Sequence, residues 1–360
     1  MHLYPHSKED LRGLWYSGTM KTKSFDYTLP ESLIASSPLD KRDTSRLLVW
    51  SRASNLIEHS QFNSILDRLG PGDVLVLNDT KVVKARVWAR RETGGEIEIL
   101  LVTPLNTGEW EVMLRSAKRL KVGEKLSLCE GCTTTFLGGT TNGLYKLSFD
   151  LDRDIFDLLQ DVGQLPLPPY MNIKKKEANQ FESQYQTVFA QKEGAIAAPT
   201  AGLHFTENLL EKLIEKGVQI ERITLHVGYG TFKPITVENI EDHDIHEERY
   251  SISPETAERL NAAMGQKRIV AVGTTVVRTL ETAFKNGAIQ SGEGNSKLYI
   301  TPGYTFSVVN ALLTNFHLPQ SSLLLLVSAL IGVDTLQEVY QQAITEQYRF
   351  YSFGDAMFIT

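Results

Sequence analysis

A run of short strands with almost no helix between them lies inside a chain that otherwise alternates strand with helix. From Gly72 onward, seven apolar segments recur about every ten residues between Gly, Asn and Lys turns: residues 74–77, 82–89, 96–102, 110–114, 125–128, 133–137 and 144–149. Such spacing is typical of a small antiparallel β-barrel. We therefore predict a barrel domain at residues 72–151.

The segments on both sides of the predicted barrel have the pattern of one α/β domain. Residues 47–50 predict a strand, and beyond residue 152 predicted strands (218–225, 269–273, 308–313) alternate with predicted helices (207–216, 254–264, 275–284, 321–331, 336–348). This alternation predicts a sheet with helices on both faces. The predicted fold is a discontinuous α/β/α domain, residues 25–71 and 152–360, with the barrel inserted and a tail at residues 1–24.

Length and charge limit the classes of function. The 360 residues include 42% hydrophobic ones, which is enough for two domains. A net charge of -6 argues against binding nucleic acid by bulk charge, so such a partner needs a local basic surface. The apolar run 321–331 is shorter than the ~20 residues of a membrane span, and residues 1–20 lack an apolar signal core. We expect a cytoplasmic monomer without membrane contact.

Two segments resemble metal sites, and both lack a required part. Cys129 and Cys132 form a lone Cys-Glu-Gly-Cys turn without the second pair or nearby histidine that zinc needs, and two cysteines cannot hold an iron–sulfur cluster. They predict a hairpin in a reducing compartment. Residues 243–248 lack the His-Glu-x-x-His pattern and predict a polar loop that could cover a site. We expect no metal and no cofactor.

Two turns that carry glycine and histidine, residues 199–206 and 225–232, bracket one amphipathic helix and the strand after it. Loops that leave the strand ends of an open α/β sheet are where ligands bind, so His204 and His226 are expected to face one crevice. The alternative is two ordinary turns, each capped by its histidine. Further positions in these turns are candidate substrate contacts: Thr200, Gly202, Phe205, Gly228, Gly230 and Thr231.

A third strand runs directly into a helix through Gly273, Thr274 and Thr275. Free backbone N–H groups and two hydroxyls at a helix N-terminus can bind an anion or ribose hydroxyls. The segment matches neither the Rossmann nor the Walker glycine pattern. Arg278 and Glu281 follow on one helix face, where the alternative to a substrate contact is a surface ion pair.

Two further motifs lie near the C-terminus. Asn315 and His317 follow the predicted strand 308–313 and are expected to project to the same side, and Pro319 ends the extended segment. Residues 348–357 place four aromatic residues beside Arg349 and Asp355. Aromatic faces can hold a purine base, although such a cluster can equally form core.

Basic residues gather in and near the predicted barrel. Such a charged face inside an acidic protein is what binding to a phosphate backbone requires, and a solvated rim is the alternative. The candidates for binding a phosphate backbone are Lys81, Arg86, Arg115, Lys118, Arg119 and Lys121.

Eight motifs in a fixed order resemble the bacterial S-adenosylmethionine:tRNA ribosyltransferase-isomerases of queuosine synthesis. They are Leu-Asn-Asp-Thr-Lys-Val-Val-Lys-Ala-Arg (77–86), Leu-Pro-Leu-Pro-Pro-Tyr (165–170), Tyr-Gln-Thr-Val-Phe (185–189), Ala-Ala-Pro-Thr-Ala-Gly-Leu-His-Phe-Thr (197–206), Thr-Leu-His-Val-Gly-Tyr-Gly-Thr-Phe (224–232), Gly-Thr-Thr-Val-Val-Arg-Thr-Leu-Glu (273–281), Thr-Asn-Phe-His-Leu-Pro (314–319) and Tyr-Arg-Phe-Tyr-Ser-Phe-Gly-Asp-Ala-Met (348–357). The resemblance runs from residue 25 to the C-terminus. It departs at residues 245–249 and 172–182.

The resemblance implies a reaction in which S-adenosylmethionine is a consumed ribosyl donor. Its ribose moves to the aminomethyl group of 7-aminomethyl-7-deazaguanine at the wobble position of tRNA and is isomerised to the epoxycyclopentanediol of epoxyqueuosine, while adenine and methionine leave. It also implies an α/β domain with an inserted barrel and no metal. The chemistry needs a base beside the sulfonium and an acid for adenine. His204, His226 and His317 are the candidates, with Asp79 or Asp355 to orient one of them.

Two other classes fit the sequence less well. A plain S-adenosylmethionine methyltransferase needs a Gly-rich first loop and an acidic residue at the end of the second strand, and the chain shows no such pair. A non-catalytic RNA-binding module would need the barrel but not three loop histidines beside Gly-Thr-Thr.

Overall fold

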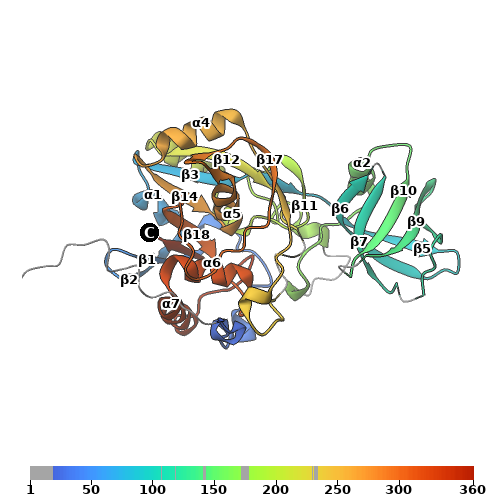
Figure 1. Ribbon diagram of the computed structural model, residues 1–360, viewed down its shortest axis with the longest axis horizontal. Helices are drawn as coiled ribbons and strands as arrows, with labels where there is room; N and C mark the ends of the chain where they lie inside the picture. Colours follow the sequence, from blue (N-terminus) through green and yellow to red (C-terminus); the bar gives the residue numbers. More distant parts are fainter. Residues whose placement is uncertain are drawn as a thin grey trace, which may run out of the picture.

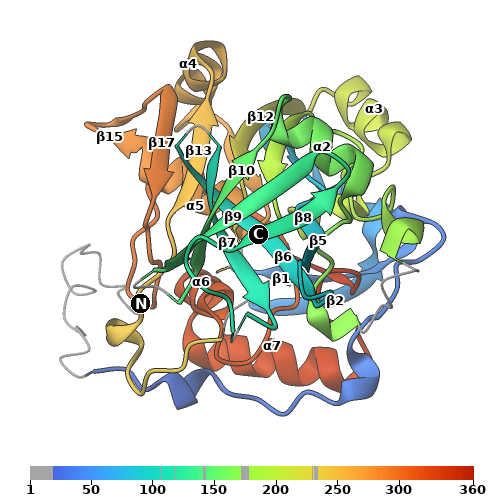
Figure 2. The ribbon, with the colours of Figure 1, turned by 90° about the vertical axis from the view of Figure 1, so that its right-hand side faces the viewer.

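The computed structural model describes residues 19–106, 108–117, 119–140, 143–171, 178–228, 230 and 234–360. An α/β domain forms one end of an elongated molecule, and a β-barrel forms the other (Figure 1). Viewed along the long axis, the barrel lies in front of the α/β domain (Figure 2). The candidate residues Lys118 and Thr231, and most of the predicted tail, lie outside the described residues.

A mixed nine-stranded sheet, in the order β17-β13-β12-β3-β14-β18-β19-β1-β2, crosses the α/β domain. Its strands are β1 (Arg46–Ser51), β2 (Leu56–Gln61), β3 (Asp73–Asn78), β12 (Gln219–Leu225), β13 (Glu248–Ile252), β14 (Arg268–Val272), β17 (Gly292–Ser296), β18 (Ala311–Asn315) and β19 (Ala356–Ile359). The four central strands, β12, β3, β14 and β18, run parallel. Their carboxyl ends therefore meet at one edge of the sheet.

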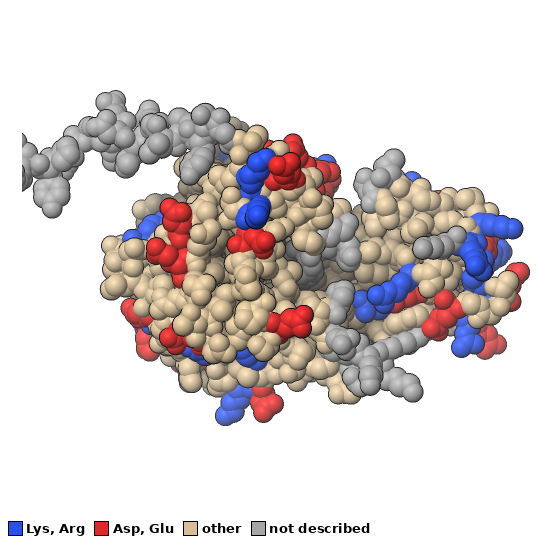
Figure 3. Space-filling view, turned by 90° about the horizontal axis from the view of Figure 1, so that it is seen from below, with Lys and Arg blue, Asp and Glu red and all other residues tan. Residues whose placement is uncertain are grey.

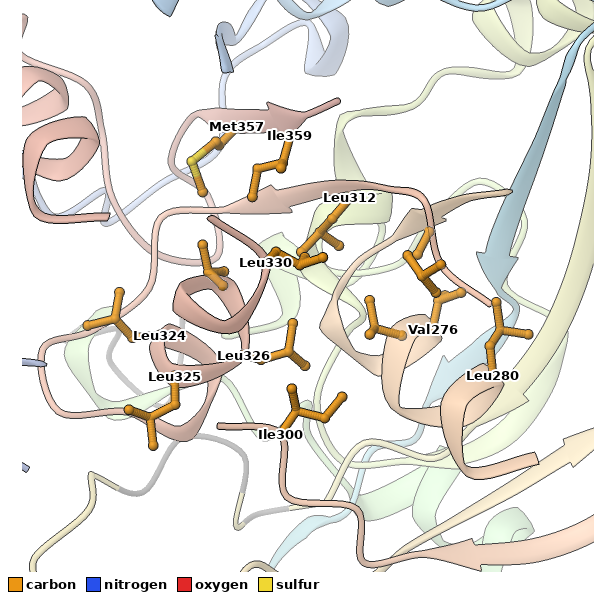
Figure 4. Packing of buried hydrophobic residues seen from close by; sticks show 14 of the residues in the cluster. Val276, Leu280, Ile300, Leu312, Leu324, Leu325, Leu326, Leu330, Met357 and Ile359 are labelled. Carbon is orange, nitrogen blue, oxygen red and sulfur yellow. The ribbon is translucent and has the colours of Figure 1, made fainter. Parts of the chain in front are cut away.

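Helices cover both faces of this sheet, which confirms the predicted α/β/α layers. Side chains alternate along β3: Val74 and Val76 belong to the core under one set of helices, and Leu75 and Leu77 to the core on the other face. The first core contains α4 (Pro254–Ala263), α5 (Thr274–Ala283), α6 (Ser322–Ile331) and α7 (Val333–Thr345), and the second contains α1 (Ile65–Arg68) and α3 (Glu207–Glu215). Leucines of α6 pack toward Leu312 and α5 (Figure 4).

The inserted barrel is closed, and its strands follow the order β10-β7-β6-β5-β8-β9. They are β5 (Arg86–Arg91), β6 (Glu96–Asn106), β7 (Glu109–Arg115), β8 (Lys125–Cys129), β9 (Cys132–Gly139) and β10 (Tyr145–Asp150), and all pairs are antiparallel. Helix α2 (Ile155–Val162) packs on the barrel core through Leu159. Cys129 pairs with Cys132 in the β8–β9 hairpin, as predicted, and both thiols are free.

The assignment of residues 74–77 to the barrel is wrong. These residues lie in β3, at the centre of the large sheet, and the barrel begins only at Arg86. Between β3 and the barrel, β4 (Thr80–Val82) pairs with β11 (Lys192–Ala195) in a separate two-stranded sheet. Elsewhere in the chain, the short strands β15 (Phe284–Lys285) and β16 (Ala288–Ile289) pair with each other in another two-stranded sheet. All six residues of β3 are buried. A strand covered on both faces has a continuous apolar sequence, whereas barrel strands such as β5 alternate.

The apolar run near the C-terminus is the buried helix α6, as predicted. Among the described helices, none alone is long and apolar enough to span a membrane; only α6 and α7 taken together pass a test of length and composition, and they are bent by 111°.

The alternative of a surface ion pair between Arg278 and Glu281 is wrong. Both side chains are buried in α5 and bind different partners. The Glu281 carboxylate accepts hydrogen bonds from the backbone N–H groups of Ser307, Val308 and Val309 at 2.9–3.0 Å. It thereby holds the segment that leads into β18.

Replacing Glu281 with alanine should lower the free energy of unfolding by about 3 kcal/mol or more, because three N–H groups lose a charged acceptor in a largely dry environment. Urea unfolding checks this, with Glu338→Ala, a change of an exposed glutamate on α7, as the matched control. Equal stabilities of the two variants would contradict this account of β18.

Candidate functional site

The carboxyl edge of the four parallel strands gathers most of the predicted site residues. His226 follows β12, Asp79 follows β3, Gly273 follows β14, and Asn315 ends β18. Asn78 ties this edge together, because its side-chain amide donates to the Leu225 carbonyl at 3.0 Å and to the Thr275 hydroxyl at 3.3 Å. The sheet thus brings together residues from four distant segments of the chain.

A pocket at the N-terminus of α5 is rich in threonine, and we call it the threonine pocket. It holds about 680 Å³ of empty space, its open mouth included, and its lining residues include Thr200, Val227, Gly273, Thr274, Thr275, Thr314, Asn315, Phe316, His317, Tyr351 and Ser352. None of the described residues that line it is Asp, Glu, Lys or Arg. Gly273 has φ 91°, a conformation that favours glycine and turns the chain from β14 into α5. The pocket is suited to a neutral ligand with hydroxyl groups.

His317 lies in the threonine pocket and is held in the neutral form. Its Nε2 is 2.9 Å from the Thr314 hydroxyl, and its backbone N–H donates to the Tyr340 hydroxyl at 3.1 Å. Burial lowers the pKa of the His317 imidazole to about 3. Tyr351 contributes another wall, and its φ of 76° is a strained backbone angle for an aromatic residue, of the kind that gathers at functional sites.

His226 lines a much larger cleft between the barrel and the α/β domain. The cleft holds about 2040 Å³ of empty space, its open mouth included, and its walls include Trp110 of the barrel, Phe156 of α2, Gly228, Gly230 and residues 244–249. The His226 Nδ1 is 2.8 Å from the Thr80 hydroxyl. A side chain at Gly194 would meet the imidazole ring at 2.8 Å, so this glycine lets the backbone approach the ring closely. Burial, and then the charge of Arg249, lower the pKa of His226.

His204 lies behind the threonine pocket. Its Nδ1 is 2.7 Å from the Ser45 hydroxyl, its Nε2 is 3.1 Å from the Asn315 amide nitrogen, and its ring stacks on Phe62. Burial lowers the pKa of His204 to about 3, with the charges of Arg349 and Arg42 as smaller causes. His204 lines a third, small cavity. The expectation that His204 and His226 face one crevice is therefore wrong, because His204, His226 and His317 each line a different cavity.

Other candidate residues are divided between the site and the framework. Gly228 and Gly230 line the cleft, and Thr200 lines the threonine pocket. Gly202 and Phe205 line none of the three cavities: a side chain at Gly202 would meet Phe189 at 2.7 Å, and Phe205 is buried in the core.

The candidate carboxylates bind groups other than histidine. Asp79 accepts a hydrogen bond from the Thr224 hydroxyl at 2.6 Å, and burial raises its pKa. Asp355 accepts from the backbone N–H groups of Arg46 and Arg349. Neither orients a histidine through these bonds.

The buried guanidinium of Arg278 pairs with Glu248 rather than lining a pocket. The same glutamate accepts from the backbone N–H of Gly228 at 2.9 Å. Arg278 therefore supports the loop that carries Gly228 beside the cleft.

Exposed cations gather on the barrel, at the right of Figure 3. Arg115, Arg119 and Lys121 are exposed there, although Arg115 lies 3.5 Å from Glu98. The other two described candidates are half-buried and paired, Lys81 with Glu193 and Arg86 with Glu98. Their charges are partly neutralised, so the exposed three are the better candidates for a phosphate backbone.

No group of three or more His, Cys, Asp or Glu side chains within the described ranges is arranged to hold a metal ion. Residues 244–248 instead line the cleft between the domains.

The cavity-lining residues that sequence reasoning missed include Arg42, Ser45, Tyr351 and Ser352. Arg42 and Ser45 stand in a polar segment without a recognisable motif. Tyr351 and Ser352 lie inside the aromatic motif 348–357, and the resemblance of this motif to the family was a signal that could have identified them.

Comparisons with known proteins place the chain in a family. The sequence profile of a family described as queuosine biosynthesis protein matches residues 22–359. The chain is 47% identical over 342 residues to the S-adenosylmethionine:tRNA ribosyltransferase-isomerase of Trichlorobacter lovleyi, with 94% of this chain and 100% of that protein covered. It is 48% identical over 344 residues to the protein of the same name from Symbiobacterium thermophilum, with the same coverage.

A solved structure agrees with these sequence matches. The crystal structure of the S-adenosylmethionine tRNA ribosyltransferase of Thermotoga maritima superposes with a TM-score of 0.53 at 38% identity, covering 94% of this chain and 100% of that one. Fold and similarity together define an α/β enzyme with an inserted barrel. The chain belongs to the family of queuosine biosynthesis proteins, which confirms the resemblance carried by its motifs.

Replacing His317 with glutamine should make stability less dependent on pH. In the folded protein His317 stays neutral down to about pH 3, whereas the unfolded chain binds a proton below about pH 6.5. Stability therefore falls as pH falls through this window, by up to about 1.4 kcal/mol per pH unit for one imidazole.

Urea unfolding of the wild type and the variant at several pH values between 8 and 4 measures this difference. At pH 8 the His317 imidazole of the wild type is neutral in both the folded and the unfolded chain, so the values there give the cost of the substitution itself. Parallel stability curves from pH 6 to pH 4 would show that His317 is not held neutral.

Proposed function

We propose that the chain transfers the ribosyl moiety of S-adenosylmethionine to 7-aminomethyl-7-deazaguanine at the wobble position of tRNA and isomerises it to give epoxyqueuosine, with release of adenine and methionine. The proposal rests on the match, over 94% of the chain, to relatives named S-adenosylmethionine:tRNA ribosyltransferase-isomerase. Two cavities support it, one suited to the donor and the other to the acceptor nucleotide. We place the reaction in the cytoplasm.

The threonine pocket suits the adenosyl part of the donor. The Thr274 side chain is only 5% exposed, and no described residue gives its hydroxyl a hydrogen bond. Such a hydroxyl at the start of α5 can bind a ribose hydroxyl. Phe316 and Tyr351 supply aromatic surface for adenine, and the absence of charged side chains among the described lining residues fits a neutral nucleoside.

The interdomain cleft suits the acceptor nucleotide. It is about three times larger than the threonine pocket and lies between the barrel and the strand ends. Trp110 and Phe156 offer aromatic surface against which an unpaired base can stack. Val227 lines both cavities, so the two substrates would meet beside it.

His226 is the best placed candidate for the base. A neutral imidazole is needed to take a proton, and the lowered pKa keeps His226 neutral at pH 7. Its Nδ1 is held by Thr80, and no described residue bonds its Nε2. His317 would contact the donor in the threonine pocket, and His204 would position Asn315 from behind.

Purified protein should release free adenine only when precursor tRNA and S-adenosylmethionine are both present. His226→Ala should slow this release about 10²-fold, the scale of a lost general base, without a matching fall in melting temperature. Single-turnover adenine release, mass analysis of the wobble nucleoside and thermal melts measure these quantities.

The matched control is His59→Ala, which changes an exposed histidine that lines none of the three cavities. Formation of S-adenosylhomocysteine would favour a methyltransferase instead. A loss of rate that tracks a loss of melting temperature would remove His226 from the chemistry.

Changing Arg115, Arg119 and Lys121 to glutamine should weaken tRNA binding and flatten its dependence on salt. Each lost phosphate contact lowers the slope of log affinity against log salt by about 0.7 to 0.9, because fewer counterions are released. Filter binding at several salt concentrations measures the slope. The control changes three exposed lysines of the α/β domain, Lys23, Lys212 and Lys285. A slope equal to that of the wild type would place the tRNA on another face.

A further inference from the structure

A small cavity on the far side of His204 carries positive charge, and we call it the arginine pocket. It holds about 300 Å³ of empty space, its open mouth included, and Arg42, Ser45, His204, Arg349, Ser352 and Phe353 are among its walls. No acidic side chain is among the described residues that line it. It adjoins the threonine pocket, since Ser352 lines both cavities.

A chain of hydrogen bonds runs from the threonine pocket to the arginine pocket, and the contacts of Asn315 determine which group donates in each bond. The Asn315 amide nitrogen faces the Asp355 carbonyl at 3.4 Å, so its Oδ1 accepts from the Thr200 hydroxyl at 2.8 Å. The same amide nitrogen donates to the Nε2 of His204, which leaves the proton of this neutral imidazole on Nδ1.

The hydroxyl proton of Ser45 lacks an acceptor among the described residues. His204 Nδ1–H donates to the Ser45 oxygen at 2.7 Å, so the Ser45 O–H must donate elsewhere. Ser45 is 2% exposed, and no described residue accepts this proton. Because a buried hydroxyl proton without an acceptor is unfavourable, the arginine pocket presents a donor that needs an acceptor from a ligand.

The two arginines add charge to that donor. Arg42 donates only to the backbone carbonyls of Ser183 and Gln186 and has no carboxylate partner in the described chain. Arg349 lies 3.7 Å from Asp355, whose carboxylate already accepts two backbone N–H groups. One guanidinium group that lines the arginine pocket therefore has no carboxylate partner among the described residues, and such a group can bind a carboxylate or phosphate.

We infer that Ser45, Arg42 and Arg349 bind a carboxylate group, and that this is the carboxylate at the methionine end of S-adenosylmethionine. The inference rests on the proposed function, because it takes the adenosyl group to occupy the adjoining threonine pocket. Cavity size favours a carboxylate on a short aliphatic chain over the backbone of a folded RNA. The carboxylate would accept from the Ser45 hydroxyl and from a guanidinium group.

Binding of S-adenosylmethionine and of its decarboxylated analogue by isothermal titration tests this site. The wild type should bind the analogue about 10-fold or more weakly, the scale of a lost charged hydrogen bond. Ser45→Ala and Arg349→Gln should each weaken binding of S-adenosylmethionine by a similar factor and leave binding of the analogue unchanged. Ser37→Ala, a change of an exposed serine, is the control.

The analogue separates a lost contact from a damaged fold, since a misfolded variant would bind both ligands weakly. Equal losses for both ligands, or none for either, would overturn the carboxylate site. Weakened tRNA binding with unchanged binding of S-adenosylmethionine would assign the site to an RNA phosphate and overturn the inference. If the wild type bound both ligands equally, only this site would fail, whereas no binding of S-adenosylmethionine would also overturn the proposed function.

Discussion

Burial of β3 between β12 and β14 is the constraint on which the rest of the molecule depends. Both partner strands follow β3 by more than a hundred residues, so the centre of the sheet forms only from segments on either side of the barrel in the sequence. The apolar side chains of β3 fill the cores on both faces of the sheet. The barrel can be inserted after β3 because it has a separate core.

This arrangement also determines where the cavities lie. The parallel run β12-β3-β14-β18 brings four strand ends to one edge, and Asn78 fastens the loop after β12 to the start of α5. Because the barrel leaves the sheet from the same edge, the cleft lies beside the pocket at α5. The histidines are separated by this geometry, with His317 in the threonine pocket, His226 in the cleft and His204 between the threonine pocket and the arginine pocket.

The fold was largely predictable because its signals are local. Hydrophobic periodicity gave the helices, the α/β/α layers and the barrel hairpins. The error at residues 74–77 came from spacing, although an unbroken apolar run already indicated a strand buried on both faces. The site was less predictable, because the residues that bind His204 are far away in the sequence: Ser45 is 159 positions from it and Asn315 is 111 positions from it. Only the folded chain shows that Gly202 and Phe205 belong to the core.

The central claim is that the carboxyl edge of the sheet binds donor and acceptor in two adjoining cavities. A crystal structure of the protein with S-adenosylmethionine tests it most directly. We expect the adenosyl group in the threonine pocket, with its ribose hydroxyls against Thr274 and its adenine beside Phe316 or Tyr351. Electron density for the adenosyl group in the interdomain cleft, with the threonine pocket empty, would contradict it.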